Sequence, residues 1–127
     1  MRLSIVIPLY NKEKFIDRCL NSLLNQNLAP EDYEIIIVDD GSTDSSYSLA
    51  CSYAEKHSNI IAHRQKNGGA GAARNKGFEL AKGDYIYFLD ADDYIAKDTL
   101  QRIVEVSEQN NLEILRRYEL IILQEGL

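Results

Sequence analysis

Acidic side chains follow two apolar segments of the chain. The pair Asp39–Asp40 comes after the apolar run Glu34–Val38. A second group, Asp90–Asp93, comes after Asp84–Leu89. If both runs are strands of an open parallel sheet, their carboxyl ends share the edge where ligands bind. Carboxylates gathered at one edge repel one another unless a cation neutralises them, so the pattern favours a metal site.

The spacing within the second group supports the same interpretation. Asp90 and Asp92 are two residues apart, and residues i and i+2 of an extended segment point the same way, so both could ligate one hard cation. Ligands that are all oxygen suit Mn²⁺ or Mg²⁺. The alternative is that Asp90, Asp92 and Asp93 cap the following helix, where acidic residues are common. The acidic pair at the neighbouring strand end favours the metal site.

A glycine-rich segment, Gly68–Arg74, begins a helix and could bind phosphate. Its backbone amides and the positive end of the helix could hold phosphate oxygens, and Arg74 adds a bidentate cation. The alternative is a flexible turn with a surface arginine. The spacing is not the dinucleotide-binding fingerprint, and no GxxxxGK[ST] loop occurs. Tyr10 follows the first expected strand, where its ring could stack on a base or close the sheet edge.

Strands and helices must alternate to place these residues. Short apolar runs predict strands, and apolar residues at helical spacing predict the helices between them. The strands expected are Leu3–Ile7, Glu34–Val38, Asn59–Arg64 and Asp84–Leu89, with Leu112–Leu115 as a fifth. We expect Asn11 to cap the first helix, and Ser42 or Thr43 the second. The alternation predicts an α/β three-layer sandwich with a mainly parallel sheet. One domain is expected over residues 1–115, with 116–127 as an unassigned tail of it.

Composition excludes several classes of protein. The chain has 127 residues, of which 45% are hydrophobic, as in an ordinary globular domain. Its net charge of −6 argues against a nucleic-acid binder with a broad basic face. Cys19 and Cys51 are expected to be buried thiols of a reducing compartment. No membrane span or signal peptide is expected, so the predicted location is the cytoplasm.

Three motifs together resemble a known family. They are SIVIPLYNKEKFIDRCLNSLLNQ, EIIIVDDGSTDSS and NGGAGAARNKGFELAKGDYIYFLDADD. From about Leu3 to Leu115 the chain resembles the donor-binding half of the family 2 inverting glycosyltransferases, which implies the GT-A (nucleotide-diphospho-sugar transferase) fold. The resemblance implies transfer of a sugar, commonly from a UDP-sugar, to an acceptor hydroxyl with inversion. It also implies a divalent cation, Mn²⁺ or Mg²⁺, that stabilises the leaving diphosphate.

The resemblance implies a role for each matching residue. Pro8 and Tyr10 would line the base pocket, and Asp39 would accept a hydrogen bond from the base. Asn67 and Arg74 would lie near the base and the diphosphate.

The DxD motif supplies the remaining donor-binding residues. Asp90 would reach toward the ribose, Asp92 would ligate the metal with Asp90 beside it, and Ala91 would allow the close backbone approach between them. Asp40 and Asp93 match family positions and could be structural, through turn and cap bonds.

The family's general base lies well downstream of its DxD motif. No acidic residue after Asp93 stands in a matching motif, so we expect a truncated, donor-binding half whose base lies beyond the chain. The implied acceptor is a saccharide or a lipid-linked molecule, as in polysaccharide biosynthesis. Peripheral association with the inner face of a membrane, through a C-terminal part, is left open. No nucleic-acid partner is expected.

Two other classes share parts of the pattern. A phospho-receiver signalling module has a similar acidic pair, but here a strand and a helix precede IIIVDDGS, and residues 112–127 contain no Ser, Thr or Lys. A haloacid-dehalogenase-like phosphatase also has a DxD after an apolar strand. That motif normally continues with a small residue and Thr, where this chain has Asp93–Tyr94. Both classes stay as alternatives to a glycosyltransferase.

Overall fold

Strands and helices alternate in the structure, a computed structural model that describes residues 1–109. The strands are β1 (Leu3–Leu9), β2 (Tyr33–Asp39), β3 (Ile60–Arg64) and β4 (Tyr85–Phe88). The helices are α1 (Ile16–Leu24), α2 (Ser46–Lys56), α3 (Ala70–Leu80) and α4 (Thr99–Gln109), with a short 3-10 helix η1 (Pro30–Asp32) before β2. The first four predicted strands are confirmed. The fifth, Leu112–Leu115, and the end of the proposed 1–115 domain lie outside the described residues.

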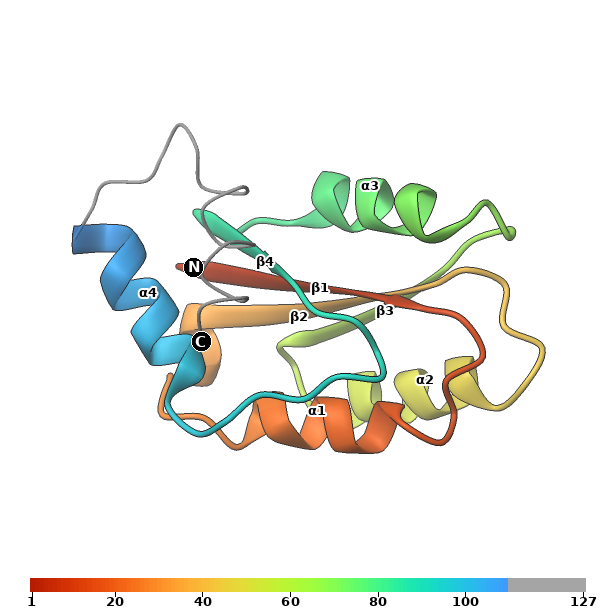
Figure 1. Ribbon diagram of the computed structural model, residues 1–127, viewed down its shortest axis with the longest axis horizontal. Helices are drawn as coiled ribbons and strands as arrows, with labels where there is room; N and C mark the ends of the chain where they lie inside the picture. Colours follow the sequence, from red (N-terminus) through yellow and green to blue (C-terminus); the bar gives the residue numbers. More distant parts are fainter. Residues whose placement is uncertain (110–127) are drawn as a thin grey trace.

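The strands form one parallel sheet in the order β3-β2-β1-β4 (Figure 1). In the register, Leu9 pairs with Asp39 and Asp39 pairs with Arg64, so these strands end at the same edge. The strand order grows from β1 to β3 on one side, whereas β4 is added on the other side of β1. A parallel sheet binds ligands where its strand order reverses in this way, which here is the crevice between β1 and β4.

Helices cover both faces of the sheet (Figure 1). Leu3, Ile5 and Ile7 of β1 belong to the main core, together with buried residues of α1 and α4. On the opposite face, Ile36 and Val38 of β2 pack with Ala73 of α3. Successive side chains of a strand point to opposite faces, and β2 is buried along its whole length, as expected between two helical layers. The predicted three-layer α/β sandwich is confirmed.

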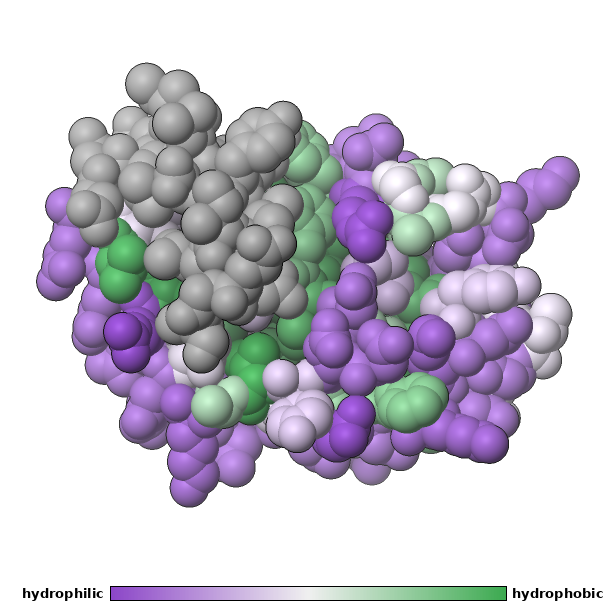
Figure 2. All heavy atoms as spheres, viewed as in Figure 1, coloured by the Kyte–Doolittle hydropathy of each residue, from purple (hydrophilic) through white to green (hydrophobic). Residues whose placement is uncertain are grey.

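The described surface is mostly polar, as expected from the ordinary globular composition of the chain. Hydrophilic side chains cover most of the described surface seen in Figure 2, and apolar side chains show in smaller areas between them. No helix among residues 1–109 is long and apolar enough to cross a bilayer. Cys19 is buried and Cys51 is half-buried, and neither forms a disulfide. Burial raises the pKa of the Cys19 thiol to about 12, so this side chain stays an inert, packed thiol.

The predicted cap of the first helix is wrong. Helix α1 begins at Ile16, and no side chain accepts a hydrogen bond at its start. Asn11 instead has φ 49°, and its Oδ1 accepts hydrogen bonds from the backbone N–H groups of Thr43 at 2.8 Å and Asp44 at 3.3 Å. The side chain of Asn11 therefore joins the loop after β1 to the loop after β2.

The predicted caps of the second helix, Ser42 and Thr43, are also wrong. Helix α2 begins at Ser46, whose backbone N–H donates to Asp44 Oδ1 at 2.8 Å. Ser42 instead turns back to the first loop, where its hydroxyl oxygen accepts a hydrogen bond from the Asn11 backbone N–H at 2.9 Å. Polar residues that looked like helix caps thus hold two adjacent loops together at the carboxyl edge of the sheet.

Helix α3 lies unusually close to the sheet at Gly77. A Cβ atom at this position would lie 2.2 Å from Cγ1 of Val6 in β1, far inside a normal contact. Ala73, one turn earlier, is also small and fully buried. The two small residues let α3 rest directly on β1 and β2, with its N-terminus near the crevice.

We expect Gly77→Ala to lower the free energy of unfolding by about 1–3 kcal/mol, because the new methyl group overlaps Val6 and forces α3 away from the sheet. Gly71→Ala in the same helix is the matched control. A Cβ there would meet nothing within 4 Å, so we expect a neutral or slightly stabilising effect, up to ~1 kcal/mol, from the better helix propensity of alanine. Urea unfolding of both variants measures the difference, and equal effects would contradict the close contact.

Candidate functional site

A cavity of about 480 Å³ lies in the crevice between β1 and β4, beside the N-terminus of α3. It brings together seven of the eight predicted donor-binding residues: Pro8, Tyr10, Asn67, Arg74, Asp90, Ala91 and Asp92. Asp39 is not among its lining residues. Lys12 and Asp40, which carried no binding role in the sequence prediction, do line it.

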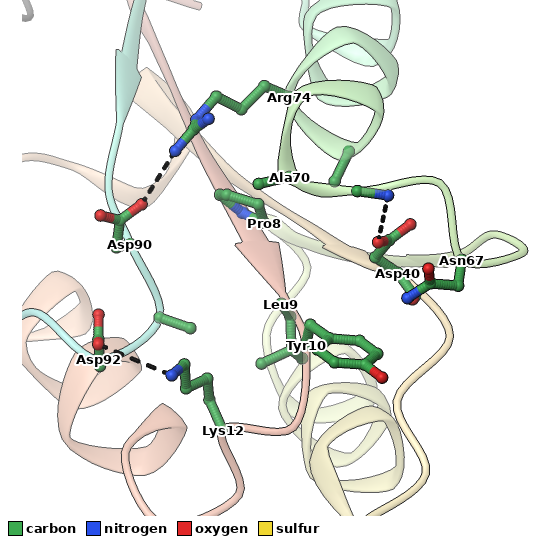
Figure 3. A pocket seen from close by; sticks show the side chains of 13 residues that line it. Pro8, Leu9, Tyr10, Lys12, Asp40, Asn67, Ala70, Arg74, Asp90 and Asp92 are labelled. Atoms are coloured by element: carbon green, nitrogen blue, oxygen red, sulfur yellow. Dashed lines mark hydrogen bonds and ion pairs between the residues drawn. The ribbon is translucent and has the colours of Figure 1, made fainter.

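The cavity has two chemically different ends (Figure 3). Tyr10 lies at one end, with its ring directed toward Asn67 and Asp40, and it is 46% exposed. Asp90 and Asp92 lie at the other end. A flat ring with amide and carboxyl groups can hold a base, whereas the acidic end can hold a cation.

The acidic end is a tight turn and not the extended segment expected from the sequence. The backbone N–H of Asp93 donates to the Asp90 carbonyl at 3.0 Å, which reverses the chain after β4. Carboxylate oxygens of Asp90, Asp92 and Asp93 lie within 4.8 Å of one another as a result. We call residues 90–93 the acidic turn. The capping alternative is wrong, because α4 begins only at Thr99.

The acidic turn fits a hard divalent cation. Its donors are carboxylate oxygens, the preferred ligands of Mg²⁺ and Mn²⁺. Burial, together with the negative charges of Asp92 and Asp90, raises the pKa of Asp93 above its usual value. The three carboxylates therefore repel one another, and a bound cation would relieve that repulsion.

Two cations face the acidic turn from opposite walls of the cavity (Figure 3). Arg74 of α3 has Nη2 3.5 Å from Asp90 Oδ1. Lys12, in the loop after β1, has Nζ 3.9 Å from Asp92 Oδ2. All four side chains are between 42% and 58% exposed, so these ion pairs contribute little to folding stability.

Helix α1 and the residue Gln26 after it fix the backbone of the acidic turn and of the segment that follows. Arg18 and Ser22 lie one turn apart on the same side of α1, and Gln26 follows just after the end of the helix. They bind main-chain groups: Arg18 Nη2 donates to the Asp92 carbonyl at 3.2 Å, Ser22 Oγ accepts from the Ile95 N–H at 3.2 Å, and Gln26 bridges the Ala96 carbonyl at 2.9 Å and the Leu100 N–H at 3.1 Å. The sequence signal for Arg18 and Ser22 is the polar side of an amphipathic helix, which usually faces solvent.

The glycine-rich loop before α3 is bound to Asp40. The Asp40 carboxylate accepts hydrogen bonds from the backbone N–H groups of Gly68 and Gly69, both at 2.8 Å, and from Gln65 Nε2 at 2.9 Å. Asn67 Nδ2 donates to the Asp40 carbonyl at 3.0 Å. The first two glycine amides are therefore not available to phosphate, and that part of the sequence prediction is wrong. Asp40 therefore has the structural role that the sequence analysis gave as one possibility.

The charge of Asp40 is stabilised by these bonds. Burial alone would raise the pKa of this carboxyl, but the hydrogen bonds from Gln65, Gly68 and Gly69 outweigh burial and lower the pKa below its usual value. The loops also approach closely next to it, since a Cβ at Gly41 would lie 3.1 Å from the Asn67 backbone nitrogen. Gly41 has φ 80°, a conformation that side chains disfavour, so glycine is required on both counts.

Asp39 lies beneath the loops, fully buried. Its Oδ2 accepts a hydrogen bond from the Ser42 backbone N–H at 3.0 Å and lies 3.5 Å from Arg64 Nε. Its Oδ1 has no hydrogen-bond partner among the described residues. Arg64 also donates to the Ser42 carbonyl at 2.7 Å and stacks over the ring of Tyr47. The sequence prediction missed Arg64, although it ends β3 beside Asp39 in the register.

Comparisons with known proteins agree on one family. The sequence model described as glycosyl transferase family 2 matches residues 4–119. A poly(ribitol-phosphate) beta-glucosyltransferase of Bacillus spizizenii is 47% identical over 116 residues, which is 90% of this chain and 18% of that protein.

Solved structures show the same similarity. The crystal structure of Staphylococcus aureus TarS 1-349 in complex with UDP-GlcNAc is 35% identical, with a TM-score of 0.82 over 87% of this chain and 32% of that one. The mannosyltransferase PcManGT from Pyrobaculum calidifontis, in complex with GDP-Man and Mn²⁺, is 27% identical, with a TM-score of 0.78 over 84% of this chain and 32% of that one. The chain thus spans about a third, or less, of the length of these proteins.

We expect Asp40→Asn to lower the free energy of unfolding by about 1–3 kcal/mol near neutral pH, because an amide cannot accept hydrogen bonds from both glycine N–H groups. The lowered pKa of Asp40 sets the pH dependence: its contribution is complete above the ordinary value of 3.8 and is lost as the pH falls through the lower folded-state pKa. The two stability curves should therefore converge in acid. Urea unfolding across pH measures this, with Asp84→Asn, at an exposed residue, as control. Curves that stay parallel in acid would contradict it.

Proposed function

The chain belongs to glycosyl transferase family 2, and we propose that it forms the donor-binding part of a glycosyltransferase that uses a UDP-sugar and a divalent cation. The observation that carries the proposal is the cavity between β1 and β4, with a base-binding end and a cation-binding end. Similar proteins have been solved with UDP-GlcNAc and with GDP-Man and Mn²⁺. Neither the phospho-receiver nor the phosphatase alternative has support from the family match.

The base would bind at the Tyr10 end of the cavity. Pro8 and Tyr10 supply apolar surface and a ring for stacking, and Asn67 supplies an amide. Asp39 is proposed to accept a hydrogen bond from an N–H of the base. Support comes from its Oδ1, which is buried and has no partner among the described residues, while Oδ2 is already bound. A buried acceptor without a partner is costly, so a base N–H that reached it would bind with selectivity. Uracil carries such an N–H.

The diphosphate would bind between the acidic turn and the start of α3. Asp92, with Asp90 and Asp93 beside it, would hold a divalent cation, Mn²⁺ or Mg²⁺, whose role is to stabilise negative charge on the leaving diphosphate. Arg74 lies on the opposite wall and can bind phosphate oxygens with its bidentate guanidinium. Ala91 is small and buried, so the turn can approach the donor closely.

Sugar transfer by inversion needs a base that deprotonates the acceptor hydroxyl. The acidic residues described after the acidic turn are Asp98, Glu105 and Glu108, and none of them lines the cavity. The carboxylate of Glu108 is already paired with the Arg2 guanidinium, at 2.7 Å. We therefore propose that the base and the site for a saccharide or lipid-linked acceptor lie outside residues 1–109. A cytoplasmic location, with association at the inner face of the membrane, belongs to the same proposal.

UDP should stabilise the protein only when a divalent cation is present, because the diphosphate and the acidic turn need a shared counter-charge. At a UDP concentration ~100 times Kd, the expected gain in the free energy of unfolding is about 2.7 kcal/mol. Thermal unfolding with UDP and Mn²⁺, compared with UDP and EDTA, measures it. Equal stabilisation in EDTA would count against the role of the metal.

Asp92→Asn and Asp39→Ala should weaken UDP binding in different ways. Asn at position 92 removes the charge that holds the cation, so affinity for UDP should fall and lose most of its dependence on Mn²⁺. Ala at position 39 removes the base acceptor, which should cost about 1–3 kcal/mol while the dependence on Mn²⁺ remains and discrimination against ADP is relaxed.

Isothermal titration of UDP and ADP, with and without Mn²⁺, separates these patterns. Asp84→Asn is the matched control, because Asp84 is an exposed acidic residue beside the other end of β4 and does not line the cavity. If Asp92→Asn and Asp39→Ala lose affinity and metal dependence alike, the proposed division between base and metal is wrong.

A further inference from the structure

Lys12 is the cavity-lining cation to which the proposed function assigns no role. Its Nζ lies 3.9 Å from Asp92 Oδ2, the carboxylate proposed as metal ligand. We infer that Lys12 is an internal counter-ion of Asp92, which a divalent cation displaces, and that the released ammonium then binds the donor's diphosphate. This inference rests on the proposed function and adds a residue to it.

The backbone of Lys12 is held firmly in place. Its N–H donates to the Ser46 hydroxyl at 2.8 Å, and its carbonyl accepts hydrogen bonds from the N–H groups of Phe15 and Ile16, both at 3.0 Å. The loop after β1 thus presents Lys12 at a fixed point on the cavity wall, with its side chain directed toward Asp92 (Figure 3). A lysine side chain is long and flexible, so the ammonium can move although the backbone cannot.

The distance between Lys12 and Asp92 suits a displaceable contact. At 3.9 Å the ammonium is beyond a direct hydrogen bond, which needs roughly 2.7–3.2 Å. The Lys12 side chain is 42% exposed and that of Asp92 is 46% exposed, so water and salt screen the attraction. A divalent cation that is ligated directly by carboxylate oxygens of the acidic turn competes well against such a pair.

The charges of the cavity give the displaced ammonium a new partner. Without a metal, Lys12 and Arg74 offset two of the three negative charges of the acidic turn. A divalent cation takes over that function and leaves the Lys12 ammonium beside the space proposed for the diphosphate. Lysine binds phosphate as a mobile point charge, so the freed group can bind the nucleotide when it arrives. Metal and nucleotide are then coupled partly through Lys12.

Removing the charge of Lys12 should change the two affinities in opposite directions. Lys12→Met keeps the apolar stem, so Mn²⁺ alone should bind about 2- to 5-fold tighter, as expected when an exposed ion pair no longer competes. UDP in saturating Mn²⁺ should bind about 10-fold more weakly, as expected for the loss of a charged contact. A purely structural role for Lys12 would weaken both, and a simple phosphate ligand would leave Mn²⁺ binding unchanged.

The experiment titrates Mn²⁺ alone, and UDP in saturating Mn²⁺, into the wild-type chain and the variants, with thermal unfolding to verify the fold. Lys12→Arg keeps the positive charge and should stay within about 3-fold of wild type in both titrations. Lys14→Met is the matched control, because Lys14 is an exposed lysine of the same loop that does not line the cavity. It should match the wild type.

The two titrations test the two roles of Lys12 separately. Mn²⁺ affinity that is unchanged or weaker in Lys12→Met overturns the counter-ion role, and unchanged UDP affinity overturns the role toward the diphosphate. If wild type binds UDP with Mn²⁺ and Lys12→Met behaves like it, the inference fails while the proposed function stands. If the wild type shows no Mn²⁺-dependent binding of UDP, the proposed function fails and the role of Lys12 fails with it.

Discussion

Repulsion among three carboxylates at the end of β4 is the constraint around which the cavity is built. Asp90, Asp92 and Asp93 bring their oxygens within 4.8 Å of one another, and burial together with this crowding raises the pKa of Asp93. Such a turn would open if only its own side chains held it. Instead, a backbone hydrogen bond closes the turn, and Arg18 of α1 donates to the Asp92 carbonyl. Lys12 and Arg74 approach the carboxylates from opposite walls of the cavity. The protein therefore keeps an arrangement that a divalent cation would stabilise.

At the same edge of the sheet, three loops that follow different strands hold one another in a common geometry. Asn11 binds the backbone of the loop after β2, and Asp40 binds the backbone of the loop before α3. In both cases one polar side chain satisfies two or more N–H groups that would otherwise need water. The loops are consequently ordered by one another, and the position of Tyr10 depends on residues more than thirty positions further along the chain.

The sequence predicted the architecture well and the local geometry of the site less well. Strands such as Glu34–Val38 are visible because burial on both faces demands a continuous apolar run. The roles of Asn11 and Ser42 were not visible, since a residue that can cap the next helix can equally bind a loop 31 or more residues away. The spacing of Asp90 and Asp92 likewise suggested an extended segment, because the turn depends on contacts with α1. Lys12 and Arg64 were missed because each acts through a partner from another strand end, and only the sheet register brings them together.

Helix α1 and Gln26, just after its end, bind the peptide groups of the segment that follows the acidic turn. Ser22 and Gln26 bind N–H and carbonyl groups of residues 95, 96 and 100, and these exist whatever side chains the segment carries. The ring of Tyr94 lies against the Arg18 guanidinium and Ile95 packs against the main core, so these two side chains are tied to the structure around the acidic turn. Ala96 and Lys97 are exposed and can accumulate substitutions, natural or engineered, while the neighbouring acidic turn keeps its shape. The fold thus separates a part of the surface that is free to diversify from a part that is not.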